Sequence, residues 1–179
     1  ELTKYISKAL TNDLPKKTEL KTRFHLLDTI VSILTGRLLP PGKKAFQFSK
    51  NQGGIKEASL LGNDIKVSAI NAGFSNGMAA HANETDDSTT EGRFHPGCAI
   101  VPATLAVAER EKLGSREIIK AIALGYDIGV RITTSLGYKT PKTSIFATHS
   151  IGPIFGCAAS AGALLKLTHE QCNYLLSYT

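Results

Sequence analysis

Two helix-like segments of the chain are built almost entirely from small residues. The first runs from about 67 to 81 and includes Ala69, Gly73 and Ala79. The second runs from 150 to about 167 and is rich in Gly, Ala and Ser. The distance between two packed helices depends on the side chains at their contact, so small residues let the axes come close. The two segments therefore predict closely packed helices.

Larger apolar residues at helical spacing predict further helices. Leu20, Phe24, Leu27, Ile30 or Val31, and Leu34 recur at steps of three or four, and Gly36 ends their segment. The other expected elements are helices from 96 to about 113 and from 115 to about 137, a loop at Pro40-Pro41-Gly42, a short helix at 45–50 and at most a short extended piece at 57–61. The predicted fold class is all-α, a bundle-like multi-helix domain with closely packed helices rich in Gly and Ala.

The C-terminal residues predict that the chain is part of a longer protein. Thr168-His-Glu-Gln171 is a capping-box pattern, which opens a helix, and the apolar run Tyr174-Leu-Leu follows it. The sequence then reaches Thr179 without a Gly or Asn that would end this helix. We therefore expect residues 1–179 to be the N-terminal portion of a larger chain.

Length and charge exclude two classes of partner. No run reaches the roughly 18 to 20 apolar residues that span a bilayer, and the opening Glu-Leu-Thr-Lys-Tyr lacks the basic and apolar regions of a signal peptide. The net charge of +6 comes from small groups such as Lys16-Lys17 and Lys43-Lys44, without a basic stripe or interleaved aromatic residues. We therefore expect no membrane and no nucleic acid as partner.

Cysteine usage bears on metal binding and on the cellular compartment. The three cysteines are odd in number, far apart and without CxxC spacing. A disulfide framework and a structural zinc site are therefore not expected. Free, buried thiols are typical of a reducing compartment, so we expect a cytoplasmic protein.

The polar stretch between the first small-residue helix and the next helix gathers groups of several pKa classes. From His81 to Cys98 it holds four carboxylates and two imidazoles, and proton-transfer chemistry is often built at such junctions. If the first helix continues through Glu84, then His81 and Glu84 lie on one face, where crowding raises a carboxyl pKa. The alternative is a solvent-exposed helix end, with Asp87 or Ser88 capping the helix that follows.

His95 is the candidate proton acceptor of this stretch. Pro96 restricts the residue before it to extended geometry, so the ring of His95 projects from the junction. An imidazole with an ordinary pKa near ~6.5 suits general base chemistry next to a carboxylate. The alternative is a histidine that only caps or packs.

A metal site is a third interpretation of the same stretch. His81, Glu84, Asp86 and His95 offer nitrogen and oxygen ligands. Their spacing matches neither His-Glu-x-x-His nor the Glu-x-x-His pairs of di-iron bundles. We therefore expect no metal.

The residues Thr148-His149-Ser150 precede the second small-residue helix. The free amide groups at a helix start can bind a substrate carboxylate, and a hydroxyl N-cap explains the same residues equally well. In the helix expected at 115–137, Asp127 and Arg131 stand four apart and predict an intrahelical ion pair.

Taken together, these segments resemble the MmgE/PrpD family. The best-marked block comprises Asn76-Gly-Met-Ala-Ala-His81, Asp86-Asp87, His95-Pro96-Gly97, Val101-Pro102-Ala103 and Ala106-Val-Ala-Glu109, and two later blocks are Gly125-Tyr126-Asp127 and the segment 155–165. The resemblance covers the chain from Leu27-Asp28 onward. It implies a helical N-terminal domain over residues 1–179 and a second, α/β domain beyond residue 179.

The resemblance also implies a function. Members of the family include 2-methylcitrate dehydratase, cis-aconitate decarboxylase and an iminodisuccinate epimerase, and they act on small polycarboxylates without a metal or organic cofactor. They move a proton on carbon next to a carboxylate or imine, with loss of water or carbon dioxide, or with return of the proton to the other face. We therefore expect a lyase of the dehydratase type. The alternatives are a decarboxylase, an epimerase or isomerase, and a non-catalytic helical dimerisation domain.

The same resemblance assigns roles to individual residues. His95 matches the family's active-site histidine and is expected to act as general base or acid. Glu84 and Asp87 are expected to orient His95 or to share its proton. The expected substrate-binding residues are Ser88, His149 and Ser150, the last at a helix start that favours a carboxylate.

Three departures from the family pattern bear on these roles. Glu84 stands where many members have Asp, and the segment between Asp87 and His95 is slightly longer than usual. Ala147 stands where an ungapped match expects His, with His149 two places on. Either His149 takes that role through a shifted loop, or the chemistry differs. Because the family's lysine comes later in the sequence, we expect this piece alone to be inactive, and the whole protein to be a homodimer.

Overall fold

Helices make up nearly all the regular structure of the computed structural model, which describes residues 1–137 and 147–179. Within those residues, the only sheet is one antiparallel pair of short strands. The elements are α1 Leu2–Lys8, the 3-10 turn η1 Ala9–Thr11, α2 Lys16–Gly36, α3 Pro40–Gln52, β1 Ala58–Ser59, β2 Lys66–Val67, α4 Ala69–Ala80, α5 Gly97–Arg110, α6 Ser115–Ser135, α7 Thr148–Leu164 and α8 His169–Ser177. The predicted all-α class is confirmed.

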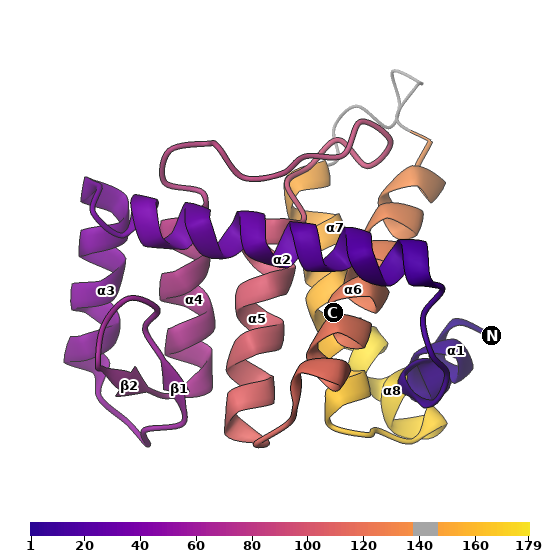
Figure 1. Cartoon of the computed structure of the whole chain (residues 1–179). Coiled ribbons are helices and arrows are strands. Elements are labelled where there is room, and N and C mark those ends of the chain that lie inside the picture. The colour runs from indigo at the N-terminus through magenta and orange to yellow at the C-terminus, as the bar shows by residue number, and fades with distance from the viewer. Residues whose placement is uncertain (138–146) are drawn as a thin grey trace.

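The helices form two layers that cross each other. In Figure 1, α3, α4 and α5 stand side by side, with α6 and α7 behind and to the right, and α2 runs across this row. The contacts agree, because α2 packs on α4, α5 and α6. In Figure 1 the polar stretch 81–96 runs above the upper ends of the upright helices, and the strands β1 and β2 lie near their lower ends. That stretch therefore lies at one set of helix ends, beside α2.

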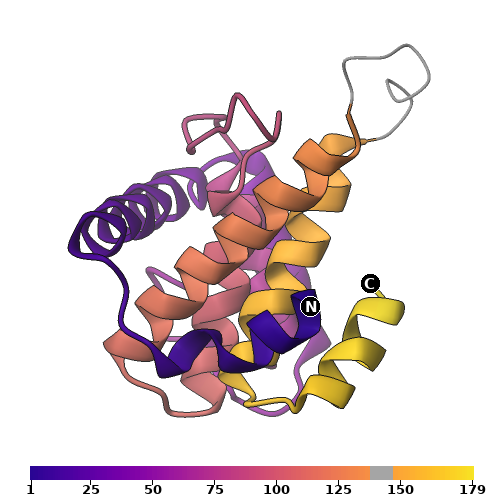
Figure 2. The same cartoon turned by 90° about the vertical axis from the view of Figure 1, so that its right-hand side faces the viewer.

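Close packing of α7 on α6 confirms the expectation for the second small-residue segment. A Cβ added to Gly129 would lie 2.8 Å from the carbonyl oxygen of Gly152, and one added to Gly156 would lie 2.7 Å from the carbonyl oxygen of Gly125. The two backbones are thus in direct contact, which any larger residue would prevent. Figure 2 shows the two helices running alongside each other for most of their length.

Most helix boundaries agree with the sequence, and one element was predicted wrongly. Pro40-Pro41-Gly42 is not a loop, because α3 starts at Pro40 and carries its prolines in the first turn. Proline is tolerated there since those amide groups have no partner inside the helix. The segment 45–50 is therefore the middle of a longer helix.

Two local predictions are confirmed by hydrogen bonds. Thr168 and Gln171 form the reciprocal capping box that starts α8, with donor–acceptor distances of 2.8 and 3.2 Å. Asp127 and Arg131 form the intrahelical ion pair at 2.6 Å. Across the part of the chain that the structure describes, no helix is long and apolar enough to cross a bilayer.

Candidate active site

The stretch from His81 to Pro96 links α4 to α5 and begins with a sharp turn. Helix α4 ends at Ala80, and the backbone of Glu84 adopts the left-handed conformation, with φ 52°. The helix thus ends close to the expected His81 and does not continue through Glu84, so the condition for placing His81 and Glu84 on one helix face is not met. Amide hydrogen bonds from Ala82 to Ala79 and from Glu84 to His81 close the turn and point the chain away from the helix axis.

Asp86 lies between two imidazoles at the end of this turn. Nδ1 of His81 is 3.0 Å from Oδ1 and 3.3 Å from Oδ2 of Asp86. Nδ1 of His95 is 3.6 Å from Oδ2 of the same carboxylate, whose side chain is 0% exposed. The acidic residues after α4 and the imidazole before Pro96 therefore converge, as the sequence predicts, but the carboxylate that joins them is Asp86.

A third imidazole stands next to His95. The ring centre of His95 is 4.9 Å from that of His81 and 5.9 Å from that of His149, which stacks on it at 24°. His149 comes from the first turn of α7. Nδ1 of His95 is buried and has no hydrogen-bond partner among the described residues. A buried polar nitrogen without a partner is costly, which marks His95 as a functional candidate.

Cys98 borders this cluster but does not provide a nucleophile. Burial raises the pKa of the Cys98 thiol, and the charge of Asp86 raises it further. Its Sγ lies 3.2 Å from the carbonyl oxygen of His95. A thiol held protonated next to a carboxylate is a poor nucleophile, so the imidazoles are the candidates for proton transfer here.

Asp87, the next residue, has different partners. His25 Nδ1 lies 2.6 Å from its Oδ2, the Tyr126 hydroxyl donates to Oδ2 at 2.8 Å, and the Gly97 amide donates to Oδ1 at 2.8 Å. Burial opposes ionisation, yet these hydrogen bonds outweigh it and keep the pKa of Asp87 below its usual value. Asp87 therefore ties α2, α6 and the start of α5 together.

Gly97 makes this anchor possible because it leaves room for the polar groups around it. A Cβ at Gly97 would lie 2.5 Å from Thr29 Oγ1, 2.6 Å from Asp87 Oδ1 and 2.9 Å from the Tyr126 hydroxyl. Burial and then the charge of Asp87 raise the pKa of Tyr126, so this hydroxyl stays protonated and donates. The alternative that Asp87 caps the helix that follows is thus the one observed.

Two hollows lie on opposite sides of the 81–96 stretch. A cavity of about 510 Å³ between α2 and α6 is lined by Asp87 and Ser88 together with His25 and Tyr126. A wider, mostly apolar hollow of about 660 Å³ on α4 and α5 is lined by His81, Glu84 and Cys98. The structure therefore does not bring all the predicted site residues to one place.

The predicted residues fall into three groups. His95 and His149 lie in the imidazole cluster, Glu84 is exposed at the rim of the apolar hollow, and Asp87 and Ser88 line the cavity beside α2. Ser150 is not at the helix start, because α7 begins two residues earlier and the Ser150 amide already donates to the Ala147 carbonyl. The helix-start role is thus unsupported for Ser150.

Three residues join the site that the predicted set leaves out. Asp86 and His81 were visible in the polar stretch, but only the turn at Glu84 brings them to His95. His25 comes from α2, far away in sequence, and nothing in the residues around it signals its contact with Asp87. In addition, His81, Asp86 and His95 each offer one ligand atom within 4.8 Å of the others, so they could hold a divalent metal ion.

The MmgE/PrpD N-terminal domain model matches residues 1–179. The chain belongs to the MmgE/PrpD family. Among curated relatives, cis-aconitate decarboxylase of Homo sapiens is 26% identical over 157 residues, which cover 85% of this chain and 32% of that protein. Cis-aconitate decarboxylase of Aspergillus terreus is 23% identical over 179 residues, covering 96% of this chain and 36% of that protein.

The match to these relatives is partial in length. The cis-aconitate decarboxylase of Mus musculus is 25% identical over 139 residues, which cover 75% of this chain and 28% of that protein. The chain thus spans about a third of the length of the curated relatives that it matches. The predicted MmgE/PrpD family membership is confirmed, and the three relatives are named as decarboxylases, which are enzymes of the lyase class.

Proposed function

We propose that this MmgE/PrpD domain supplies the proton-transfer groups of a lyase that acts on a small polycarboxylate. The observation that carries the proposal is the position of Asp86, a fully buried carboxylate between the Nδ1 atoms of His81 and His95. A carboxylate hydrogen-bonded to Nδ1, as at His81, fixes the ring orientation. At His95, where the distance is 3.6 Å, the nearby negative charge stabilises the protonated imidazole. The nitrogen that is not engaged with Asp86, Nε2, then serves as the acid or base.

The two lyase reactions use His95 in opposite directions. In a dehydration, His95 takes the proton from carbon next to a carboxylate, the C–O bond breaks, and the departing hydroxide takes a proton from an acid such as His149 to leave as water. In a decarboxylation, the C–C bond breaks, carbon dioxide leaves, and the electron pair on carbon takes a proton from His95. His81 lies on the other side of Asp86 and provides a second imidazole, which can pass a proton toward His95 through the Asp86 carboxylate.

The resemblance to the family favours dehydration, because that reaction is frequent among its members, whereas the named relatives favour decarboxylation as a second candidate. The relatives of human, mouse and Aspergillus terreus all bear the name cis-aconitate decarboxylase. Their identity of 23 to 26% supports the family more than the substrate. Both reactions move one proton on a polycarboxylate, so the imidazole cluster suits either.

The remaining part of the active site is proposed to come from a second, α/β domain. The length of the curated relatives supports this proposal, because the chain covers about a third of it. Active sites are often found between domains, and the imidazole cluster lies where α4 ends and α5 and α7 begin. The free thiols Cys98, Cys157 and Cys172 also support a reducing, cytoplasmic location.

The test uses a family-length protein. By this we mean a protein that contains residues 1–179 together with the additional residues that make its relatives about three times as long. It is supplied with 2-methylcitrate, cis-aconitate or iminodisuccinate, and water loss, carbon dioxide release and epimerisation are followed separately. His95→Gln should abolish turnover of the accepted acid, while Ser135→Ala, on the exposed end of α6, should leave it unchanged. Wild-type turnover by His95→Gln would refute the proposal. Binding of every acid without turnover would favour the non-catalytic dimerisation domain instead.

A further inference from the structure

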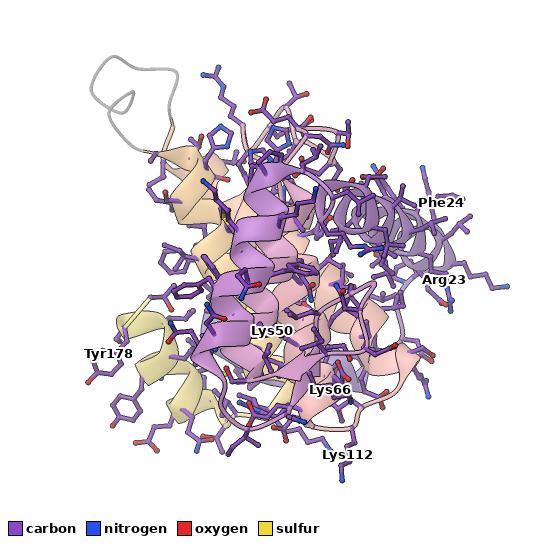
Figure 3. The ribbon with its side chains drawn as sticks, turned by 90° about the vertical axis from the view of Figure 1, so that its left-hand side faces the viewer. Arg23, Phe24, Lys50, Lys66, Lys112 and Tyr178 are labelled. Atoms are coloured by element: carbon purple, nitrogen blue, oxygen red, sulfur yellow. The ribbon has the colours of Figure 1, made fainter. Side chains whose placement is uncertain are left out.

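A cavity of about 390 Å³ lies between the end of α2, helix α3 and the turn that joins β1 to β2. Arg37, which follows α2 directly, lines it together with Lys43 and Lys50 of α3. Lys43, Gln47 and Lys50 are four and three residues apart, so they lie on one face of that helix. Figure 3 views the molecule from the α3 side and shows Lys50 on the lower part of this helix. No Asp or Glu is among the described residues that line the cavity, so its wall carries three positive charges and no negative one.

Arg37 is the most unusual of the three cations. Its Nε atom is buried and has no hydrogen-bond partner among the described residues. A guanidinium is always charged and only donates hydrogen bonds, so burying one of its N–H groups without a partner is costly. The arginines that are paired with a carboxylate are Arg23, Arg110, Arg116 and Arg131. Arg37 forms no ion pair of this kind with a described residue, so an anion in the cavity would balance its charge.

Gly62 places the turn between β1 and β2 against the guanidinium of Arg37. A Cβ at Gly62 would lie 2.5 Å from Nε and 2.9 Å from Cζ of Arg37, and the backbone of Gly62 has a φ of 78°, which favours glycine. Amide hydrogen bonds from Leu60 to Ile65 and from Asn63 to Leu60, at 2.9 and 3.1 Å, close the turn. The turn thus holds Arg37 in place before a ligand arrives, which lowers the entropy lost on binding.

Four apolar residues complete most of the cavity wall. They are Leu38, Phe46, Leu60 and Ile65. Small-molecule sites typically have volumes of roughly 300 to 1,000 Å³ and combine an apolar lining with a few polar groups. A guanidinium matches the geometry of a phosphate group, and a lysine ammonium binds phosphate as a point charge. The lining therefore suits a phosphate group attached to a small apolar or aromatic group.

We propose that this cavity binds a small organic phosphate, with Arg37, Lys43 and Lys50 around the phosphate group and the apolar residues against the organic part. Asp64, in the same turn, is exposed and does not line the cavity, so it does not cancel these charges at the wall. None of the residues that line the cavity belongs to the imidazole cluster, so the site is separate from the one proposed for the polycarboxylate. A ligand in the cavity joins α2 and α3 to the β1–β2 turn.

The test is isothermal titration calorimetry of the family-length protein with phenyl phosphate, a phosphate ester with one apolar ring. The wild type should bind it with a dissociation constant of about 1 mM or lower. Arg37→Gln removes a charged donor and should weaken binding about tenfold or more. Lys43→Gln and Lys50→Gln, which remove point charges, should each weaken it about threefold to tenfold. Inorganic phosphate lacks the ring and should bind more weakly than phenyl phosphate.

The matched control is Lys44→Gln, which removes the same charge from α3 at an exposed residue outside the cavity wall. It should leave the dissociation constant within about twofold of the wild-type value, because a solvent-screened charge contributes little. Lys43, Lys44 and Lys50 are all exposed, so circular dichroism should show unchanged helix content in these variants. His95→Gln should also leave binding of phenyl phosphate unchanged, so the result does not depend on turnover.

Three results overturn the proposal outright. The first is no binding of phenyl phosphate at about 10 mM. The second is a Lys44→Gln variant that weakens binding as much as Lys43→Gln does, and the third is loss of binding in His95→Gln. Tighter binding of citrate than of phenyl phosphate, with the same loss in Arg37→Gln, would assign the cavity to a polycarboxylate and overturn the proposal as well.

Discussion

Two neighbouring carboxylates, Asp86 and Asp87, face opposite sides of the same backbone. Asp86 meets the two imidazoles His81 and His95, whose side chains are partly exposed. Asp87 meets His25, Tyr126 and the amide of Gly97, all within the contact between helices. The first carboxylate is a partner of groups that a substrate can reach, and the second joins three helices.

From this difference we propose that chemistry and stability are divided between the two adjacent residues. Asp87 accepts three hydrogen bonds, which keep its pKa low and its charge fixed. A carboxylate so fully paired has no remaining role in proton exchange near neutral pH. Asp86 instead lies against the imidazoles of His81 and His95 and next to the Cys98 thiol, and it accepts no hydrogen bond from α2 or α6 among the described residues. The comparison therefore predicts that activity depends on the Asp86 side and folding on the Asp87 side.

The largest effect is expected on the Asp86 side, at His95. Replacing His95 with Gln removes the proton-transfer group but keeps a polar side chain of similar length. In the family-length protein, turnover of the accepted polycarboxylate should fall about 10²- to 10⁴-fold. The melting temperature of the variant should stay near that of the wild type. If His95→Gln loses its activity because it unfolds, the proposed division of activity and stability between the Asp86 and Asp87 sides is contradicted.

The next effect is expected at Gly97, on the Asp87 side. A methyl group there would collide with Thr29, Asp87 and Tyr126, which are held by other helices. Gly97→Ala should therefore destabilise the chain by about 3 kcal/mol, at the upper end of overpacking costs. Urea unfolding followed by circular dichroism measures this change. Unchanged stability would show that the Asp87 anchor is looser than the contacts indicate.

A smaller effect is expected for Asp87→Asn, together with a change in pH dependence. Losing the charge in these hydrogen bonds should cost about 1.5 to 3 kcal/mol at pH 7. Because the pKa of Asp87 is lowered by folding, its contribution is present above the unfolded value, near ~3.9, and is lost as pH falls below that value. The stability difference between wild type and Asp87→Asn should thus shrink below about pH 4. A stability difference that grows below about pH 4 would mean that folding raises the pKa of Asp87 instead of lowering it.

The smallest effect is expected at Glu84, which is exposed at the rim of the apolar hollow. Glu84→Gln should change the free energy of unfolding by no more than about 0.5 kcal/mol. Its effect on turnover should also be smaller than that of His95→Gln, because Asp86 and not Glu84 contacts the imidazoles. If Glu84→Gln abolishes turnover in the family-length protein, Glu84 contacts the substrate, and this contact matters more for turnover than the contacts of Asp86 with His81 and His95.

The sequence predicts the helices well because they depend on local patterns. The small residues of α6 and α7, the capping box at Thr168 and the Asp127–Arg131 pair all act within one helix or at one crossing. The wrong prediction at Pro40 has a local cause too, since prolines suit both a loop and a first helical turn. The exact residues at which helices begin and end are therefore the part of the fold that local sequence patterns do not determine.

The site is less predictable because its partners come from distant segments. The sequence identifies His95 and the acidic stretch, but a left-handed turn at Glu84 decides which carboxylate reaches the imidazoles. His25 contacts Asp87 only because α2 crosses the helical row, a tertiary arrangement with no local signal. The apolar spacing of α2 likewise predicts a helix but not that this face is exposed.

The most direct test compares Asp86→Asn and Asp87→Asn in the same family-length protein, measuring kcat/KM for the accepted polycarboxylate and the melting temperature of each. Asp86→Asn should lose at least about a hundredfold in kcat/KM with little change in melting temperature. Asp87→Asn should lower the melting temperature by several degrees, about 2–8 °C per kcal/mol lost, and keep most of the activity of the folded fraction. The opposite pattern, with activity lost at Asp87 and stability lost at Asp86, would contradict the account.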